Sequence, residues 1–263
     1  MENIKMIVSD VDNTLMTDDN IIPPSFFHII NNLLNNNVKV VIASGRQLLN
    51  LYSLFNPFDK KITFISQNGS IISEGHSIIF QYKIPHNTVK KCIAFGIENK
   101  VSVLLYTIDN VIVVNPIKEV LTKLDSYNVA YKIATNIMVN KNVYKISYFI
   151  IDNDITSIQN KIKIDGIDAV ISHKYMIDIT PLNINKGTAL KFLQSLYNIS
   201  SNMTCVFGDS ENDIDMFKEA YYSYAMYNAP DNVKATASRI APSNNQEGVI
   251  TVLKQIFSIS IQR

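Results

Sequence analysis

The chain has 263 residues, of which 47% are hydrophobic and 18% are charged, and its formal net charge is +1. This composition is typical of a folded globular protein, and the near-zero charge argues against nucleic acid or an anionic membrane as a partner. Two cysteines are too few for a disulfide framework, so we expect buried thiols in a reducing compartment. No apolar run reaches the roughly 18 residues of a membrane span. We therefore expect a cytoplasmic protein.

The first part of the chain alternates strands and helices. Residues 4–9 predict a buried strand, residues 23–35 carry apolar side chains at helical spacing, and residues 38–43 predict a second strand. A further helix leads to a third strand at 62–66. Alternation in such short order predicts parallel pairing with right-handed crossovers. Because these strands are continuously apolar, we expect a sheet that is covered on both faces.

The pattern changes in the middle of the chain. Residues 71–80 predict a hairpin with its turn at Glu74-Gly75. A separate α+β block then follows between residues 82 and 183. Its predicted helices cover 87–99 and 153–164, and its predicted strands cover 101–106, 111–114, 145–151, 167–172 and 175–179.

The alternation of strands and helices returns at Lys186. The predicted elements of this last part are helices at 186–197, 213–220 and 247–257 and strands at 204–208 and 222–226. The fold class that we expect is α/β, with a Rossmann-like core built on a parallel sheet. This core comprises residues 1–81 and 184–263, and an inserted α+β domain at 82–183 interrupts it.

Polar residues stand where the core strands end. Asp10 and Asp12 follow the first strand, Ser44-Gly45 the second, Asn68-Gly69 the third, and Asp209 the strand at 204–208. Ligands in open α/β sheets bind beyond the carboxyl ends of the strands. Buried carboxylates are costly unless they bind a cation or take part in chemistry. We therefore expect these strand ends to form one shared acidic site.

The residue types at this site point to phosphoryl transfer. Several carboxylates in one cleft repel one another unless a cation neutralises them, and oxygen ligands without a His/Cys cluster favour Mg²⁺ over zinc. Ser44 and Gly45 offer a hydroxyl and a backbone N–H at a predicted helix N-terminus, which favours anions. Lys186 could reach a phosphoryl group as a point charge. Each feature alone has an ordinary reading, such as a solvated turn for Asp10/Asp12 or a solvated lysine.

Four motifs occur along the chain, in the order Asp10-Val11-Asp12-Asn13-Thr14-Leu15, Ser44-Gly45-Arg46, Asn185-Lys186-Gly187 and Gly208-Asp209-Ser210-Glu211-Asn212-Asp213-Ile214-Asp215-Met216. Together they resemble the haloacid dehalogenase superfamily, and within it the Cof-type (subfamily IIB) phosphatases, whose large cap (type C2) is an insertion. The resemblance spans nearly the whole chain, including the closing segments 225–229 and 244–249.

The chain departs from the family pattern at two positions. Asn13 and Tyr227 each stand where the family usually has Gly. Asn tolerates left-handed backbone better than other non-Gly residues, so we expect the turn at Asn13 to survive. Tyr227 could crowd the loop beside the site.

The resemblance implies a catalytic role for the first motif. Asp10 would be the nucleophile that forms an aspartyl-phosphate. Asp12 would protonate the leaving oxygen and then activate water. Asp10, the backbone carbonyl of Asp12, and Asp209 would hold Mg²⁺.

It also implies binding roles for the later motifs. Ser44, Gly45 and Lys186 would bind the transferring phosphoryl group. Asn212 would orient Lys186 or the substrate. Asp213 would support the metal ligands or bind a metal-bound water.

The function expected from this resemblance is a Mg²⁺-dependent phosphatase that acts on small phosphorylated metabolites. Sugar phosphates come first, followed by cofactor phosphates such as pyridoxal phosphate or FMN. The inserted domain would close over the site and set specificity, and the protein would be a monomer or a weak homodimer. A phosphomutase or phosphotransferase on the same fold and a non-catalytic phospho-acceptor or binding protein are the alternatives.

Overall fold

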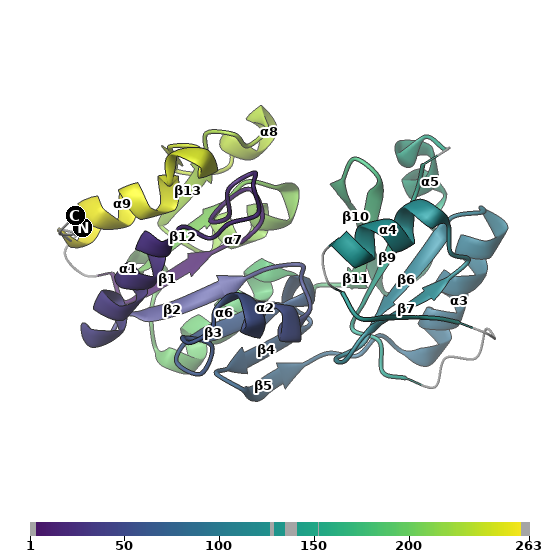
Figure 1. The fold of residues 1–263 in the computed structure, drawn as a ribbon, viewed down its shortest axis with the longest axis horizontal. Coiled ribbons are helices and arrows are strands. Elements are labelled where there is room, and N and C mark those ends of the chain that lie inside the picture. Colours follow the sequence, from purple (N-terminus) through teal and green to yellow (C-terminus); the bar gives the residue numbers. More distant parts are fainter. Residues whose placement is uncertain (1–3, 127–128, 135–140, 152, 259–263) are drawn as a thin grey trace.

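The computed structural model describes residues 4–126, 129–134, 141–151 and 153–258. The strands of these residues form one eight-stranded sheet and one six-stranded sheet, which lie side by side in Figure 1. We call the larger sheet with its helices the core domain and the smaller one with its helices the inserted domain, for which we propose residues 82–183 as the limits.

The core sheet has the order β14-β13-β12-β1-β2-β3-β4-β5. Its pairs from β14 to β3 are parallel, and β4 and β5 add an antiparallel hairpin at one edge. The strands are β1 (Met6–Ser9), β2 (Lys39–Ala43), β3 (Thr63–Ser66), β4 (Ile71–Glu74), β5 (Ser77–Gln81), β12 (Thr204–Gly208), β13 (Tyr222–Met226) and β14 (Arg239–Ala241).

The register of the central strands brings the acidic segments together. Ser9, the last residue of β1, pairs with Phe207 of β12 and with Ile42 of β2. Because the three strands run in the same direction, the residues that follow them leave the sheet at one edge. Asp10 and Asp209 are therefore neighbours although 198 positions separate them in the chain.

Helices cover both faces of the core sheet, because successive strand side chains point to opposite faces. Ile7 packs in a cluster with α1 (Pro24–Asn35), α2 (Leu48–Leu54) and α9 (Gly248–Phe257). Met6 and Val8 pack on the other face with α6 (Lys186–Tyr197), α7 (Ile214–Lys218) and α8 (Asp231–Lys234). Short 3₁₀ turns cover Gln67–Gly69, Ser201–Met203, Glu211–Asp213 and Asn244–Gln246.

The inserted domain has a largely antiparallel sheet in the order β10-β11-β9-β6-β7-β8. Its helices α3 (His86–Glu98) and α5 (Ile155–Lys161) pack on one face, and α4 (Lys118–Ser126) packs on the other. Only β7 and β8 pair in parallel among the described strands of this sheet. The strands are β6 (Ser102–Tyr106), β7 (Val111–Val114), β8 (Tyr131–Ile133), β9 (Lys145–Phe149), β10 (Ile167–His173) and β11 (Met176–Pro181).

The α/β class and the parallel core predicted from the sequence are confirmed. Within the described ranges, two α-helices and two strands were not predicted: α4, β8, α8 and β14. The helix expected at 213–220 is a 3₁₀ turn at Glu211–Asp213 followed by the short α7. Cys92 and Cys205 are both buried and unpaired, and across the described ranges no helix has the length and apolar content of a membrane span.

Candidate active site

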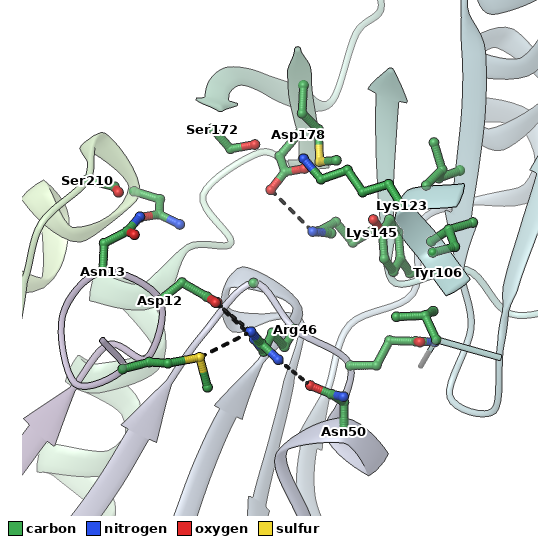
Figure 2. A pocket seen from close by; sticks show the side chains of 18 of the residues that line it. Asp12, Asn13, Arg46, Asn50, Tyr106, Lys123, Lys145, Ser172, Asp178 and Ser210 are labelled. Atoms are coloured by element: carbon green, nitrogen blue, oxygen red, sulfur yellow. Dashed lines mark hydrogen bonds and ion pairs between the residues drawn. The ribbon is translucent and has the colours of Figure 1, made fainter. Parts of the chain in front are cut away.

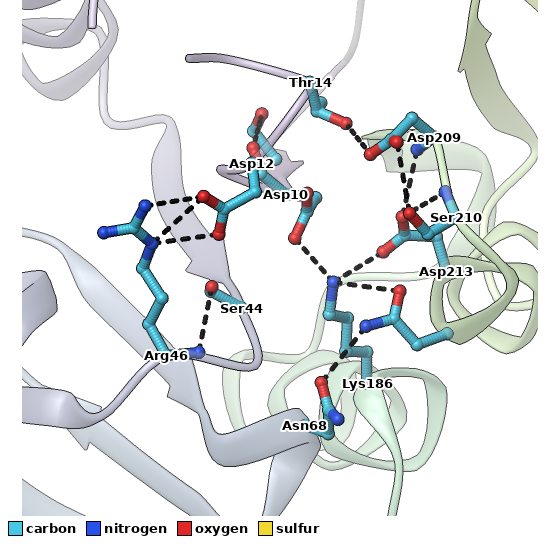
Figure 3. A network of polar contacts seen from close by, with 12 residues as sticks. Asp10, Asp12, Thr14, Ser44, Arg46, Asn68, Lys186, Asp209, Ser210 and Asp213 are labelled. Carbon is cyan, nitrogen blue, oxygen red and sulfur yellow. Dashed lines mark hydrogen bonds and ion pairs between the residues drawn. The ribbon is translucent and has the colours of Figure 1, made fainter. Parts of the chain in front are cut away.

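Lys186 is the centre of a buried polar network at the ends of β1 and β12. Its Nζ lies 2.6 Å from Oδ1 of Asp10 and 2.7 Å from Oδ1 of Asp213. Figure 3 marks both contacts with dashed lines. Its side chain is 1% exposed, so the reading as an ordinary solvated lysine is wrong. Although burial disfavours the ammonium, the two carboxylates outweigh that effect and raise the pKa of Lys186.

The start of α6 fixes the place of Lys186. The side chain of Asn185 accepts a hydrogen bond from the backbone N of Thr188, and Thr188 Oγ1 accepts one from the backbone N of Asn185, which is a reciprocal N-terminal cap. A Cβ on Gly187 would lie 2.6 Å from the backbone of Asp215. This close contact between α6 and α7 therefore requires glycine beside Lys186.

Three carboxylates surround this lysine. Ligand oxygens of Asp10, Asp209 and Asp213 all lie within 4.8 Å of one another, and all three residues are buried. Lys186 balances one of the three charges, so two negative charges remain in excess when all are ionised. Burial raises the pKa of Asp10 well above its usual range despite the neighbouring Lys186. Burial and then Asp213 raise the pKa of Asp209 to about 7.

The donors around these carboxylates indicate which of them suit a cation. Asp213 accepts at Oδ1 from Lys186 and at Oδ2 from the backbone N–H groups of Asp209 and Ser210. Among the described residues, Asp209 accepts hydrogen bonds only from the hydroxyls of Thr14, at 2.8 Å, and Ser210, at 3.1 Å. Asp213 is thus occupied by protein donors. The excess charge and the oxygen-only donor set fit a hard divalent cation.

Asp12 has a different partner from Asp10. Its carboxylate accepts two-point hydrogen bonds from Arg46, at 2.9 Å from Nε and 2.6 Å from Nη2, and its side chain is 47% exposed. Arg46 also donates to Asn50 at 2.9 Å, and its backbone N–H donates to Ser44 Oγ at 3.1 Å. Asp10 therefore faces Lys186, whereas Asp12 faces the loop after β2 (Figure 3).

The two departures from the family pattern have clear local structures. Asn13 has φ of 55°, so the turn takes the left-handed conformation that we expected. Its carbonyl accepts a hydrogen bond from Asn228 Nδ2 at 2.8 Å. Tyr227 is 67% exposed, and Lys234 Nζ lies 5.2 Å from its ring centroid.

A cavity of about 310 Å³ lies between the two domains, a volume at the lower end of small-ligand pockets. Asp10, Asp12, Gly45 and Asn212 line it from the core domain, and Figure 2 shows Lys145 and Asp178 across from Asp12 and Arg46. The inserted domain also supplies Lys123 and Ser172 and an apolar wall that consists of Leu104, Tyr106, Val120, Leu124, Val129, Phe149 and Met176.

Several residues of this site were not assigned from the sequence. Asn68, noted there only as a strand-end residue, donates from Nδ2 to Asp178 at 3.0 Å and accepts from Asn212 at 3.2 Å. Asn212 in turn lies 3.5 Å from Lys186 Nζ, which fits its expected orienting role. Lys145 and Asp178 were not singled out. Charged residues inside the predicted apolar strands 145–151 and 175–179 were the available signal.

Comparisons with known proteins agree with this geometry. A family model described as haloacid dehalogenase-like hydrolase matches residues 7–253. A 5-amino-6-(5-phospho-D-ribitylamino)uracil phosphatase of Escherichia coli is 28% identical over 97% of both chains. A solved structure from Streptococcus mutans has a TM-score of 0.91 at 25% identity and covers 97% of this chain and 100% of its own. A sugar phosphatase of subclass IIB has a TM-score of 0.84 at 23% identity, with 97% and 100% covered, and supports the fold.

Proposed function

The chain belongs to the haloacid dehalogenase-like hydrolases and is a phosphoric monoester hydrolase, and from this premise we propose that it is Mg²⁺-dependent and acts through an aspartyl-phosphate on small phosphorylated metabolites. The observation that carries the proposal is the buried group of Asp10, Asp209, Asp213 and Lys186 at the wall of the cavity. Such a group can hold a cation and present a carboxylate to phosphorus.

Asp10 is the proposed nucleophile. Lys186 holds one of its carboxylate oxygens, and the residue lines the cavity. The carboxylate forms an O–P bond, the P–O bond of the ester breaks, and Asp12 gives its proton to the leaving oxygen. Water then attacks phosphorus and passes a proton to Asp12. The O–P bond to Asp10 breaks in this step, so that phosphate is released and both carboxyl groups are restored. Asp12 has to exchange its contact with Arg46 for these proton transfers.

Ser44, Gly45 and Lys186 are the proposed phosphoryl-binding groups. Ser44 is buried directly after β2 and next to Gly45, and the ammonium of Lys186 lies beside the proposed nucleophile Asp10. Positive charge and N–H donors placed where negative charge grows stabilise the transition state. Asn212 lies between Lys186 and Asn68 and orients the lysine.

We assign the metal ligands to Asp10, the backbone carbonyl of Asp12, and Asp209. Asp213 positions these ligands and does not bind the metal itself, because its oxygens accept hydrogen bonds from Lys186 and from two backbone N–H groups. When bound, Mg²⁺ would neutralise the excess carboxylate charge and polarise a phosphoryl oxygen.

The apolar wall bears on the substrate class. A simple sugar phosphate would place its hydroxyls against side chains such as Leu104 and Phe149, which offer no hydrogen bonds. A phosphate ester that carries a ring or hydrocarbon part would bury it there. The Escherichia coli relative acts, by its name, on a ribitylaminouracil phosphate. We therefore place ring-bearing polyol phosphates, FMN among them, beside sugar phosphates as proposed substrates.

A panel of sugar, polyol and cofactor phosphates, assayed for inorganic phosphate release with and without Mg²⁺, tests the proposal. Wild-type protein should release phosphate in a Mg²⁺-dependent manner, and Asp10→Asn should abolish release with the circular dichroism spectrum unchanged. Conversion to an isomer without phosphate release would instead identify a phosphomutase. Stable phosphorylation of Asp10 without turnover would identify a phospho-acceptor protein.

A further inference from the structure

Lys145 places a buried ammonium beside the phosphoryl-binding loop. It is the first residue of β9 in the inserted domain, its side chain is 5% exposed, and it lines the cavity. A Cβ added to Gly45 would lie 3.6 Å from Lys145 Nζ and 3.0 Å from Oδ1 of Asn68. The loop after β2 therefore approaches both residues closely, which brings the ammonium next to Gly45, a proposed phosphoryl-binding residue.

The ammonium of Lys145 has more N–H donors than acceptors among the described residues. Among the residues that the structure describes, it makes one hydrogen bond, of 3.2 Å to Asp178 Oδ2, and lies 4.3 Å from the ring centroid of Tyr106. An ammonium carries three N–H donors. Although burial disfavours the charge, Asp178 and then Tyr106 outweigh it and raise the pKa of Lys145. Since unpartnered buried donors are costly, the cavity needs an acceptor here.

A bound ligand can supply the acceptor, because Lys145 lines the cavity and Asp178 is already occupied. Asp178 accepts from Lys145, from Asn68 Nδ2 at 3.0 Å and from Ser147 Oγ at 2.5 Å. The lysine and aspartate together carry no net charge. A second phosphate or a carboxylate would gain little from such a neutral pair. A hydroxyl or carbonyl oxygen suits it, since it needs donors and no net positive charge.

We infer that Lys145 is a specificity-determining residue, which donates hydrogen bonds to a hydroxyl or carbonyl oxygen carried by the leaving group close to the esterified carbon. Asp178 and Asn68 are positioning residues that hold it there. The inference rests on the proposed phosphatase function and narrows its substrate class. Esters of polyhydroxy or keto compounds are favoured over esters whose leaving group has no oxygen near the phosphate.

Asn68 also connects this recognition to the core domain. It bridges Asp178 of the inserted domain and Asn212 of the core domain, and Asn212 reaches Lys186. The chain of contacts from Lys145 to Asp10 thus passes from one domain to the other. Lys145 is in place when the two domains meet through Asn68.

The test compares two substrates, D-ribitol 5-phosphate, which has hydroxyls beside the phosphoester, and p-nitrophenyl phosphate, which has none. In Lys145→Met, the ratio of kcat/KM for the first to that for the second should fall about 10- to 100-fold, as expected for hydrogen bonds to a charged group, with most of the change in KM. Asn68→Ala should shift the ratio in the same direction. Lys161→Gln, an exposed lysine of α5 in the same domain, should not.

Equal losses with both substrates would overturn the inference, because Lys145 would then act on the phosphoryl group or on the fold. An unchanged ratio, or a wild-type enzyme that uses p-nitrophenyl phosphate alone, would overturn it too. If neither ester is hydrolysed by any variant, the phosphatase proposal fails for these substrates. Ligand binding, measured without turnover, then tests the role of Lys145. Calorimetry should then show that Lys145→Met, made in the Asp10→Asn background, weakens D-ribitol 5-phosphate at least tenfold more than inorganic phosphate. Equal weakening would refute the inference.

Discussion

Replacing Lys186 by methionine tests the charge balance of the site. Methionine keeps most of the side-chain volume, so the main change is the loss of contacts at 2.6 and 2.7 Å to Asp10 and Asp213. Breaking a buried ion pair by removing one partner costs about 3–5 kcal/mol. For a chain of this length, that cost corresponds to a fall in Tm of roughly 6–20 °C.

The loss should depend on pH. The pKa of Asp10 is already raised by burial, and Lys186 is the charge that holds it down. Without the lysine the pKa of Asp10 rises further. An acid whose pKa is higher in the folded than in the unfolded state loses its contribution to stability as pH rises through the folded pKa. Lys186→Met should therefore be more destabilised at pH 8 than at pH 5.

Differential scanning calorimetry at the two pH values measures this difference. Lys191→Met is the matched control, because Lys191 lies on the same helix but is 69% exposed and 3.9 Å from Glu219. It should change stability by less than about 0.5 kcal/mol. Equal Tm losses at pH 5 and pH 8 for Lys186→Met, or a loss no larger than the control's, would refute the charge-balance reasoning.

Three further predictions concern the acid, the metal and the loop. Asp12→Asn should slow phosphate release about 10²- to 10⁴-fold in steady-state assays, and unchanged turnover would remove its proton-transfer role. Because the pKa of Asp209 is raised to about 7 from 3.8, metal-free protein should lose stability between about pH 4 and 7 and regain it with Mg²⁺ at pH 8. A Mg²⁺ effect on melting that is larger at pH 5 than at pH 8 would contradict this. Arg46→Lys keeps the charge but loses the two-point contact that positions Asp12 before and after its proton transfers, so kcat should fall about tenfold, and equal kcat values would show that this contact does not matter for turnover.

The core of the fold could be predicted from the sequence because its strands are buried on both faces. Segments such as 40–43 are continuously apolar and have helices on either side, and this pattern is local. Three of the missed elements, β8, α8 and β14, are short and depend on their partners. β8 and β14 have three residues each and lie at sheet edges, and Ile240 of β14 is exposed. Their pairing is set by the tertiary structure and leaves little periodicity in the sequence.

The site could be predicted in part for a similar reason. Residues that follow parallel strands converge by topology, so Asp10 and Asp209 were expected to be close, and they are. The contact between Asp12 and Arg46 depends on the conformations of two loops, which no strand pattern fixes. Lys145 and Asp178 lie in strands of the other domain, where a charged residue usually marks a solvent face. Their place at the cavity depends on how the two domains pack.

The two domains contribute different kinds of groups to the site. In the proposed mechanism, the core domain supplies the groups that touch phosphorus or neutralise charge, such as Asp10 and Lys186, and these would act on any phosphate ester. The inserted domain supplies the apolar wall and the neutral pair of Lys145 and Asp178, which we propose contact the leaving group. Interactions that strengthen only in the transition state raise kcat, whereas uniform binding of the leaving group lowers KM. Substitutions in the core domain should therefore act mainly on kcat, and those in the inserted domain mainly on KM, with Asn68, which bridges the two, affecting both.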